Sequence, residues 1–350
     1  MPSFQQLENS FSELDRGIPR LTAIRDAIHE ADQQQDIEWM FWFRYDYLEE
    51  SIFCGDRYYA MIIFPEMLSI YDKYPQLQEN GRVRHSMLIA FKWIVEAAPE
   101  FPQVSREEID GYFRLFKRRL IEQGCSLSIY YMKRSLFYMH VDRGVAAACF
   151  YRFLDAPLDS ISDGKALYYD QQVQFYLSVD DEEKALKAAE PIFSGKLHSN
   201  SLPQATYHDF IRYYLRKRNY EEAARYARMT EHRVNGDPYY LDAIGSLMSL
   251  AAVMDPERGA ALFNRNYPEF AASKNPWLRT LFLIGAAHLT ARFAKDGAYP
   301  ENFCKPAELQ AETPAELAAW FAQEAETNAQ KFDARNGTDD YLQMLRMLQF

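Results

Sequence analysis

The chain has 350 residues, 48% of them apolar and 15% aromatic, and a formal net charge of −11. This apolar content excludes a mostly disordered chain, and the negative charge speaks against general nucleic-acid binding, because phosphates would be repelled. The apolar runs stay below the roughly 18 residues that a membrane span needs, so we expect no membrane association.

The four cysteines, Cys54, Cys125, Cys149 and Cys304, are far apart in the sequence. Most of them lie in apolar helical contexts, which indicates reduced thiols rather than disulfides. The first residues lack the basic and apolar segments of a secretion signal. We therefore expect a cytoplasmic protein.

Helical periodicity runs along the whole chain, and residues 1–34 are predicted to form one or two amphipathic helices that cap the N-terminal end. From residue 35 to residue 295 a short pattern recurs, in which a polar turn residue is followed four positions later by a small residue. These pairs are Asp56 and Ala60, Asp142 and Ala146, Asp181 and Ala185, Asn219 and Ala223, and Asp255 and Gly259. The last four small residues are 39, 38 and 36 positions apart, a period that suits two helices and their turns.

The physical chemistry of each position fits a helical hairpin. The polar residue can cap the second helix of the hairpin, and the small residue lets the two helices approach closely. Strand signals are nearly absent, because no long alternating run of β-branched residues occurs. The repeated pattern therefore predicts a stack of helical hairpins over residues 35–295.

The clearest repeat spans residues 204–238. Its characteristic positions are Tyr207, Phe210, Ile211, Tyr214, Ala223 and Pro238. This pattern resembles the tetratricopeptide repeat, which has aromatic, large and small residues in its first helix, a small residue in its second helix and then a proline. A second repeat, at 166–199, matches less fully. The resemblance implies an all-α fold, a right-handed alpha-alpha superhelix (a solenoid of degenerate helical hairpins).

Residues 296–350 are predicted to contain a loop and the helices that cap the C-terminal end. Residues 296–312 are the best loop candidate, and Thr313, followed by proline and an acidic residue, is typical of a helix start. The tail, residues 338–350, has the pattern of a short apolar helix. We expect this helix to cover the open end of the solenoid.

Two basic segments interrupt the acidic chain. Residues 111–153 hold eight basic and two acidic side chains, net +6, and residues 212–233 hold seven and three, net +4. In tetratricopeptide hairpins the first helix usually lines the inner face, and adjacent tyrosines cannot all point into the core. The resemblance therefore implies a partner-binding groove lined by Lys133, Arg134, Arg212, Arg216, Tyr130, Tyr169 and Tyr213. Such a groove would hold an acidic segment or a C-terminal carboxylate; the alternative interpretation is salt bridging with the acidic segments of the chain.

Motifs for catalysis are weak. No phosphate loop, paired-cysteine zinc motif or His-Glu-x-x-His string occurs, and we expect neither a metal nor a cofactor. Arg134 and His140 have the Arg-x5-His spacing of helical ribonucleases. Chance alone predicts about as many such matches as the two that occur, the second being Arg225 and His232.

The sequence therefore predicts a non-enzymatic module that binds a partner protein or peptide on a solenoid surface. It would act as an adaptor, or as an inhibitor such as an immunity protein that neutralises a toxin. The alternatives are a peptide-sensing regulator and a helical ribonuclease that uses Arg134 and His140. Nucleic acid is not an expected partner.

Overall fold

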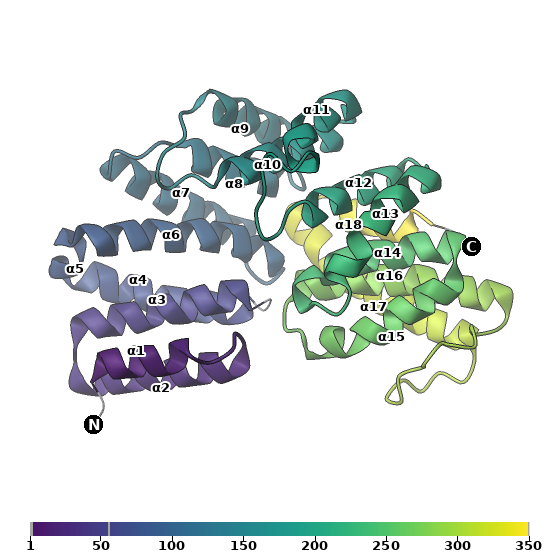
Figure 1. Cartoon of the computed structure of the whole chain (residues 1–350), viewed down its shortest axis with the longest axis horizontal. Helices are drawn as coiled ribbons and strands as arrows, with labels where there is room; N and C mark the ends of the chain where they lie inside the picture. The colour runs from purple at the N-terminus through teal and green to yellow at the C-terminus, as the bar shows by residue number, and fades with distance from the viewer. Residues whose placement is uncertain (1–2, 55–56, 349) are drawn as a thin grey trace. The chain divides into compact units, whose positions relative to one another are not determined.

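A computed structural model describes residues 3–54, 57–348 and 350 of the chain (Figure 1). Over this part of the chain the fold is all-helical and forms no strand, and the helices pack against their neighbours in sequence order as an alpha-alpha solenoid. The predicted fold class is thus confirmed. The chain divides into two compact units: unit 1 comprises Met1–Arg134 and Tyr151–Ser162, and unit 2 comprises Ser135–Phe150 and Asp163–Phe350.

Unit 1 is built from antiparallel helices joined by short turns. Its helices are α1 (Phe4–Ser12), α2 (Ile18–Gln34), α3 (Ile37–Phe53), α4 (Tyr58–Lys73), α5 (Pro75–Glu79), α6 (Gly81–Ala97) and α7 (Arg106–Glu122), with the 3-10 turn η1 (Ala98–Glu100). Two further helices, α8 (Ser128–Tyr138) and α9 (Arg143–Asp155), each have residues in both units.

Unit 2 is built from successive helical hairpins. Its helices are α10 (Lys165–Ser178), α11 (Glu182–Phe193), α12 (Gln204–Arg216), α13 (Tyr220–Val234), α14 (Leu241–Met254), α15 (Pro256–Ala272), α16 (Pro276–Asp296), α17 (Pro314–Asn336) and α18 (Asp340–Arg346), with the 3-10 turn η2 (Pro238–Tyr240). The helices α10, α12, α14 and α16 contact one another in that order. They form one layer, and α11, α13, α15 and α17 pack on it as the second helices.

The repeated pair of a polar and a small residue does what its chemistry predicts. The side chains of Asp181, Asn219 and Asp255 each accept a backbone N–H bond at the start of α11, α13 and α15. The small residues that follow them, Ala185 and Ala223 among them, are fully buried between helices. The first predicted turn residue, Asp56, lies outside the described residues.

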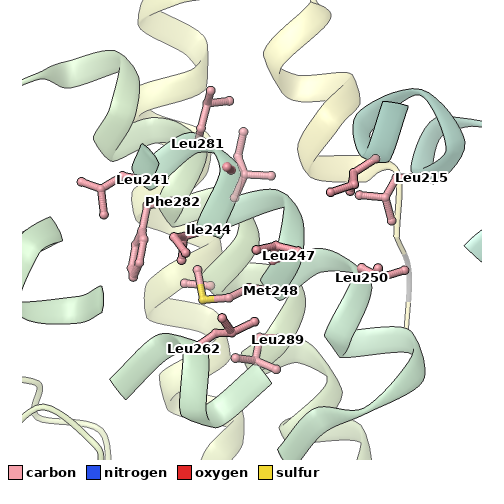
Figure 2. Packing of buried hydrophobic residues seen from close by; sticks show 14 of the residues in the cluster. Leu215, Leu241, Ile244, Leu247, Met248, Leu250, Leu262, Leu281, Phe282 and Leu289 are labelled. Atoms are coloured by element: carbon pink, nitrogen blue, oxygen red, sulfur yellow. The ribbon is translucent and has the colours of Figure 1, made fainter. Parts of the chain in front are cut away.

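Part of the core of unit 2 lies where α14 and α16 cross (Figure 2). Leucine, isoleucine, methionine and phenylalanine side chains from α12, α14, α15 and α16 interdigitate there. The crossing is close because Gly245 of α14 faces Gly285 of α16, and a Cβ atom at Gly285 would lie 2.2 Å from the Gly245 carbonyl oxygen. The backbones themselves are therefore in contact, which fixes the position of α14 in the layer.

The C-terminal region follows the predicted order of a loop and two helices. Thr313 caps α17 by accepting the Glu316 N–H, and the loop before it is tied to α15 by the Asn264 side chain, which bonds Asn302 and Cys304. The last helix, α18, packs against α16 and α17. Within the described part of the chain, none of the helices combines the length and the apolar character that crossing a membrane requires.

Candidate functional site

A cavity of about 460 Å³ opens on the layer formed by α10, α12, α14 and α16. We call it the unit 2 cavity. Its walls are completed by residues 139–143 and by α18, and all of its lining residues belong to unit 2. The apolar part of the wall comes from Leu177, Leu215, Leu281, Ile284 and Met344. The volume is in the range of pockets that hold small ligands or a few residues of a peptide.

The floor of the unit 2 cavity carries an unusual carboxyl group. Asp209, on α12, lines the cavity, and its carboxyl has no hydrogen-bond or ion-pair partner among the residues that the structure describes. Burial, together with the nearby charges of Asp170 and Asp242, raises the pKa of Asp209 well above its usual range, although Arg212 opposes this shift. Asp209 is partly buried, and a carboxyl that is moved out of water without gaining a hydrogen bond costs stability. Its presence therefore calls for a reason other than the fold.

Two buried histidines lie on the same layer. His208 Nε2 is 2.9 Å from Ser246 Oγ, and His208 Nδ1 is 3.5 Å from Asp242 Oδ2. His288 lies between Ser249 Oγ, at 2.9 Å from Nδ1, and the Leu345 carbonyl oxygen, at 2.8 Å from Nε2. Burial lowers the pKa of each imidazole to about 4. Both histidines are therefore neutral at pH 7, and His288 holds the α18 segment in place.

The rim of the cavity is rich in arginine. The lining includes five arginines and three aspartates, a formal net charge of +2 with histidine neutral: Arg143, Arg212, Arg216, Arg218, Arg346, Asp209, Asp242 and Asp340. Only Arg216 among these arginines forms an ion pair within the described residues, to Asp180 at 2.7 Å. Within the described residues the Arg212 guanidinium forms one hydrogen bond, to the thioether of Met344 at 3.9 Å. The cavity thus presents four guanidinium groups that have no carboxylate within 4 Å in the described chain.

The segment before α18 closes one side of the cavity. Asp340 Oδ2 is 3.3 Å from His140 Nδ1, and Thr338 Oγ1 donates to the His140 carbonyl oxygen at 3.2 Å. The hydrogen bond from His140 lowers the pKa of Asp340. Tyr341, which is 3% exposed, stacks on Phe332 of α17. The tail, which we expected to cover the end of the solenoid, forms one wall of this cavity.

The structure places the predicted partner-binding residues of unit 2 in three different settings. Arg212 faces the cavity without an ion pair. Arg216 and Tyr213 also line it, but Arg216 is paired with Asp180 and the Tyr213 hydroxyl donates to Glu182 at 3.3 Å. Tyr169 is half-buried against the core and is not part of the lining. For Arg216, the alternative interpretation of salt bridging holds.

The predicted partner-binding residues of unit 1 also lie in different settings. Lys133 is only 7% exposed, and its Nζ lies 2.6 Å from Glu96 Oε2. Our expectation that it lines an open groove is therefore wrong, because a lysine at this depth requires a carboxylate partner and has one. Arg134 lies 3.8 Å from Asp110, and it lines a separate pocket in unit 1 together with Tyr130, which is mostly buried.

Arg134 and His140, the pair of the ribonuclease alternative, line different pockets. Arg134 belongs to the pocket of unit 1, near Asp110, and His140 belongs to the unit 2 cavity, paired with Asp340. A catalytic arginine and histidine must reach the same substrate. Neither pocket contains both residues, so the geometry of the described residues adds no support to this alternative.

Sequence reasoning missed Asp209. A signal was present, because Asp170 and Asp209 are 39 residues apart, which is one repeat period, and both lie on the cavity layer.

In the described residues, no group of three or more His, Cys, Asp or Glu side chains is arranged to hold a metal ion. Comparison of the sequence with protein-family models and with curated proteins found no match.

Proposed function

We propose that this chain is a non-enzymatic binding module of tetratricopeptide-like hairpins, and that its unit 2 cavity holds a short acidic segment or the C-terminal carboxylate of a partner protein. The observation that carries this proposal is the set of four arginines on the rim that have no carboxylate within 4 Å in the described chain, beside a partly buried carboxyl that has no hydrogen bond there. Both kinds of group become satisfied when a peptide binds.

A peptide offers carboxylate oxygens and N–H groups, and the unit 2 cavity has a guanidinium for the first and a carboxyl for the second. A guanidinium such as that of Arg212 can bind a carboxylate through two parallel N–H bonds, the strongest polar contact that side chains offer. The Asp209 carboxyl can accept a backbone or side-chain N–H of the same segment. The apolar wall, including Leu281 and Ile284, provides contact for an aliphatic side chain.

The size of the cavity limits the kind of partner. A space of about 460 Å³ takes a few residues, not a folded domain, so the partner must insert an exposed segment or a chain end. This supports recognition of a peptide or a protein tail. An adaptor, an inhibitor such as an immunity protein and a peptide-sensing regulator would all use the cavity in this way.

The first test compares wild type with Arg212→Glu. Proteins that co-purify with the tagged chain are identified by mass spectrometry, and the affinity of the dominant partner is measured by calorimetry. We expect Arg212→Glu to weaken binding by at least 30-fold, about 2 kcal/mol, because a desolvated charge contact becomes a repulsion. Arg228→Glu is the matched control, since Arg228 is exposed on the outer helix α13. An equal loss of affinity in both variants, or no loss of affinity in Arg212→Glu, would refute the proposal.

A second variant separates binding from folding. Asp209→Asn removes the charge of a partly buried carboxyl that has no hydrogen bond within the described residues, so we expect it to raise the free energy of unfolding by about 1 kcal/mol at pH 7. Because the pKa of Asp209 is raised, this gain in the free energy of unfolding grows as the pH rises above 3.8, the ordinary pKa of an aspartate. If Asp209 accepts a ligand N–H, the same variant binds the partner more weakly. A variant that is both less stable and unchanged in binding would contradict this role.

A further inference from the structure

One face of α7 in unit 1 carries a basic stripe that the proposed function does not use. Arg114, Lys117, Arg118 and Ile121 have the spacing i, i+3, i+4 and i+7, which places them on one side of the helix. The opposite side of α7, including Ile109 and Phe116, is buried in the core. Ile121 is 58% exposed. The stripe therefore combines cations with an exposed aliphatic side chain.

The stripe borders a pocket of about 500 Å³, which we call the α7 pocket. Its other residues include Tyr130 and Arg134 of α8, and all of them belong to unit 1. The Phe113 and Tyr130 rings contact each other at a centroid distance of 6.0 Å, and Lys117 Nζ lies 5.6 Å above the Tyr130 ring. These aromatic rings form the floor of the pocket between the two helices.

The charge of the α7 pocket is not balanced locally. Four cations, Arg114, Lys117, Arg118 and Arg134, face the carboxylates of Asp110 and Glu122, which gives a net charge of +2. In the part of the chain that the structure describes, Arg114 and Lys117 have no carboxylate within 4 Å. Arg118 reaches only Glu122, at 3.7 Å, and both of these side chains are largely exposed.

Other cations of the same basic segment do have carboxylate partners. Arg119 pairs with Asp72, and Lys133 pairs with Glu96. The described part of the acidic chain therefore supplies carboxylates to these cations but none within 4 Å of Arg114 or Lys117. We propose that the α7 pocket is a second docking site, independent of the unit 2 cavity, and that it binds an acidic protein segment. That segment carries two or more carboxylates within one helical turn and an aliphatic side chain that packs on Ile121.

The pocket favours a protein segment over nucleic acid for two reasons. Tyr130 is only 6% exposed, so its face is not available to stack on a base. The stripe from Arg114 to Ile121 is about 10 Å long, at 1.5 Å per helical residue, which matches two turns of a peptide helix rather than an extended strand of nucleotides.

A displayed library of random peptides, each about 15 residues long, tests this inference with the full chain. The wild type and the double variant Arg114→Glu, Lys117→Glu are panned in parallel. The double variant Arg25→Glu, Lys73→Glu is the control, because it changes the net charge equally at exposed sites of unit 1. We expect the wild type and the control to enrich peptides with paired acidic residues and a leucine or isoleucine, and the pocket variant not to enrich them.

Fluorescence polarisation then measures the affinity of one enriched peptide. The pocket variant should bind it at least tenfold more weakly, with the loss reduced at high salt. A peptide with lysine in place of its acidic residues should bind the pocket variant better than the wild type. Arg212→Glu, in the other unit, should leave this affinity unchanged, so that failure here and failure of the unit 2 cavity are distinguishable.

Three outcomes would overturn the inference. The wild type could enrich no peptide beyond those that the pocket variant enriches. The enriched peptides could lack acidic residues. A single-stranded oligouridylate could bind more tightly than any enriched peptide and lose its binding in the pocket variant, in which case the α7 pocket is a nucleic-acid site.

Discussion

The crossing of α14 and α16 gives the sharpest test of the fold, through the substitution Gly285→Ala. A Cβ atom at Gly285 would lie 2.2 Å from the Gly245 carbonyl oxygen and 2.6 Å from the Gly245 Cα. Ordinary contacts of this kind begin at about 3.4 Å, so the two helices must separate by roughly 1 Å. The obstacle is backbone, which cannot rotate away as a side chain can.

The expected cost follows from two opposing effects. Overpacking of a well-packed core costs about 1–3 kcal/mol, and a clash between backbones belongs at the upper end of that range. Replacing glycine by alanine inside a helix contributes about 1 kcal/mol in the opposite direction. We therefore expect Gly285→Ala to lower the free energy of unfolding by about 2 kcal/mol. Because Gly245 lines the unit 2 cavity, partner binding should weaken as well.

Two other glycines provide matched controls. A Cβ at Gly111, inside α7, meets only the end of the Arg114 side chain, at 3.6 Å, so Gly111→Ala should raise stability by up to about 1 kcal/mol. A Cβ at Gly259 meets the Leu289 Cδ1 atom, at 2.4 Å from a side-chain end that can rotate. The free energy of unfolding of Gly259→Ala should therefore lie between those of Gly285→Ala and Gly111→Ala.

Urea denaturation followed by circular dichroism measures these differences, and hydrogen exchange of α14 and α16 peptides assigns them to unit 2. The second measurement is needed because two compact units need not unfold together. We would abandon the explanation from close backbone contact if Gly285→Ala proved as stable as Gly111→Ala, or if exchange in α14 and α16 were unchanged.

Three further predictions concern buried polar groups. Glu96→Gln should lower stability by about 2 kcal/mol at pH 7, because it removes the carboxylate that pairs with the buried Lys133. Burial opposes ionisation of Glu96, but Lys133 and a neighbouring arginine lower its pKa to about 2. In urea titrations the difference in stability between wild type and variant should therefore vanish as the pH falls from 4.5 toward 2. Burial lowers the pKa of His288 to about 4, so stability should fall as the pH drops from 6.5 toward 4, and His288→Gln should flatten that part of the profile. Thr206→Val removes the buried 2.5 Å bond from Thr206 Oγ1 to Asp170 and should cost about 1–3 kcal/mol in urea denaturation, whereas Thr206→Ser, which keeps the hydroxyl, should cost less.

The hairpins could be predicted from the sequence because their signals are local. Asp181, Asn219 and Asp255 bond backbone groups within the next few residues, so the caps depend on a short stretch of chain. The small residues Ala185 and Ala223 recur at the repeat period and mark where two helices meet. These features need no knowledge of distant contacts.

The state of each cation could not be predicted in the same way. Lys133 and Arg212 have similar sequence settings, on the first helix of a hairpin in a basic segment. Their difference depends on whether a carboxylate arrives from elsewhere in the fold, and Glu96, 37 residues before Lys133, does so. Periodicity gives the helix face of a residue, but it does not give the partner that faces it across two helices.

The contrast between partnered and unpartnered polar groups locates the sites better than residue type does. Arg44 is as buried as any arginine of the chain described, and it serves the fold, because Asp32 and Glu66 lie 2.7 and 3.4 Å from its guanidinium. Arg212 has no carboxylate so close, and Asp209 beside it has no hydrogen bond. Apolar residues in their places would make unit 2 more stable. Their retention on a cavity surface is explained if a ligand supplies the missing partners, and the opposite effects expected of Asp209→Asn on stability and on binding follow directly from this reasoning.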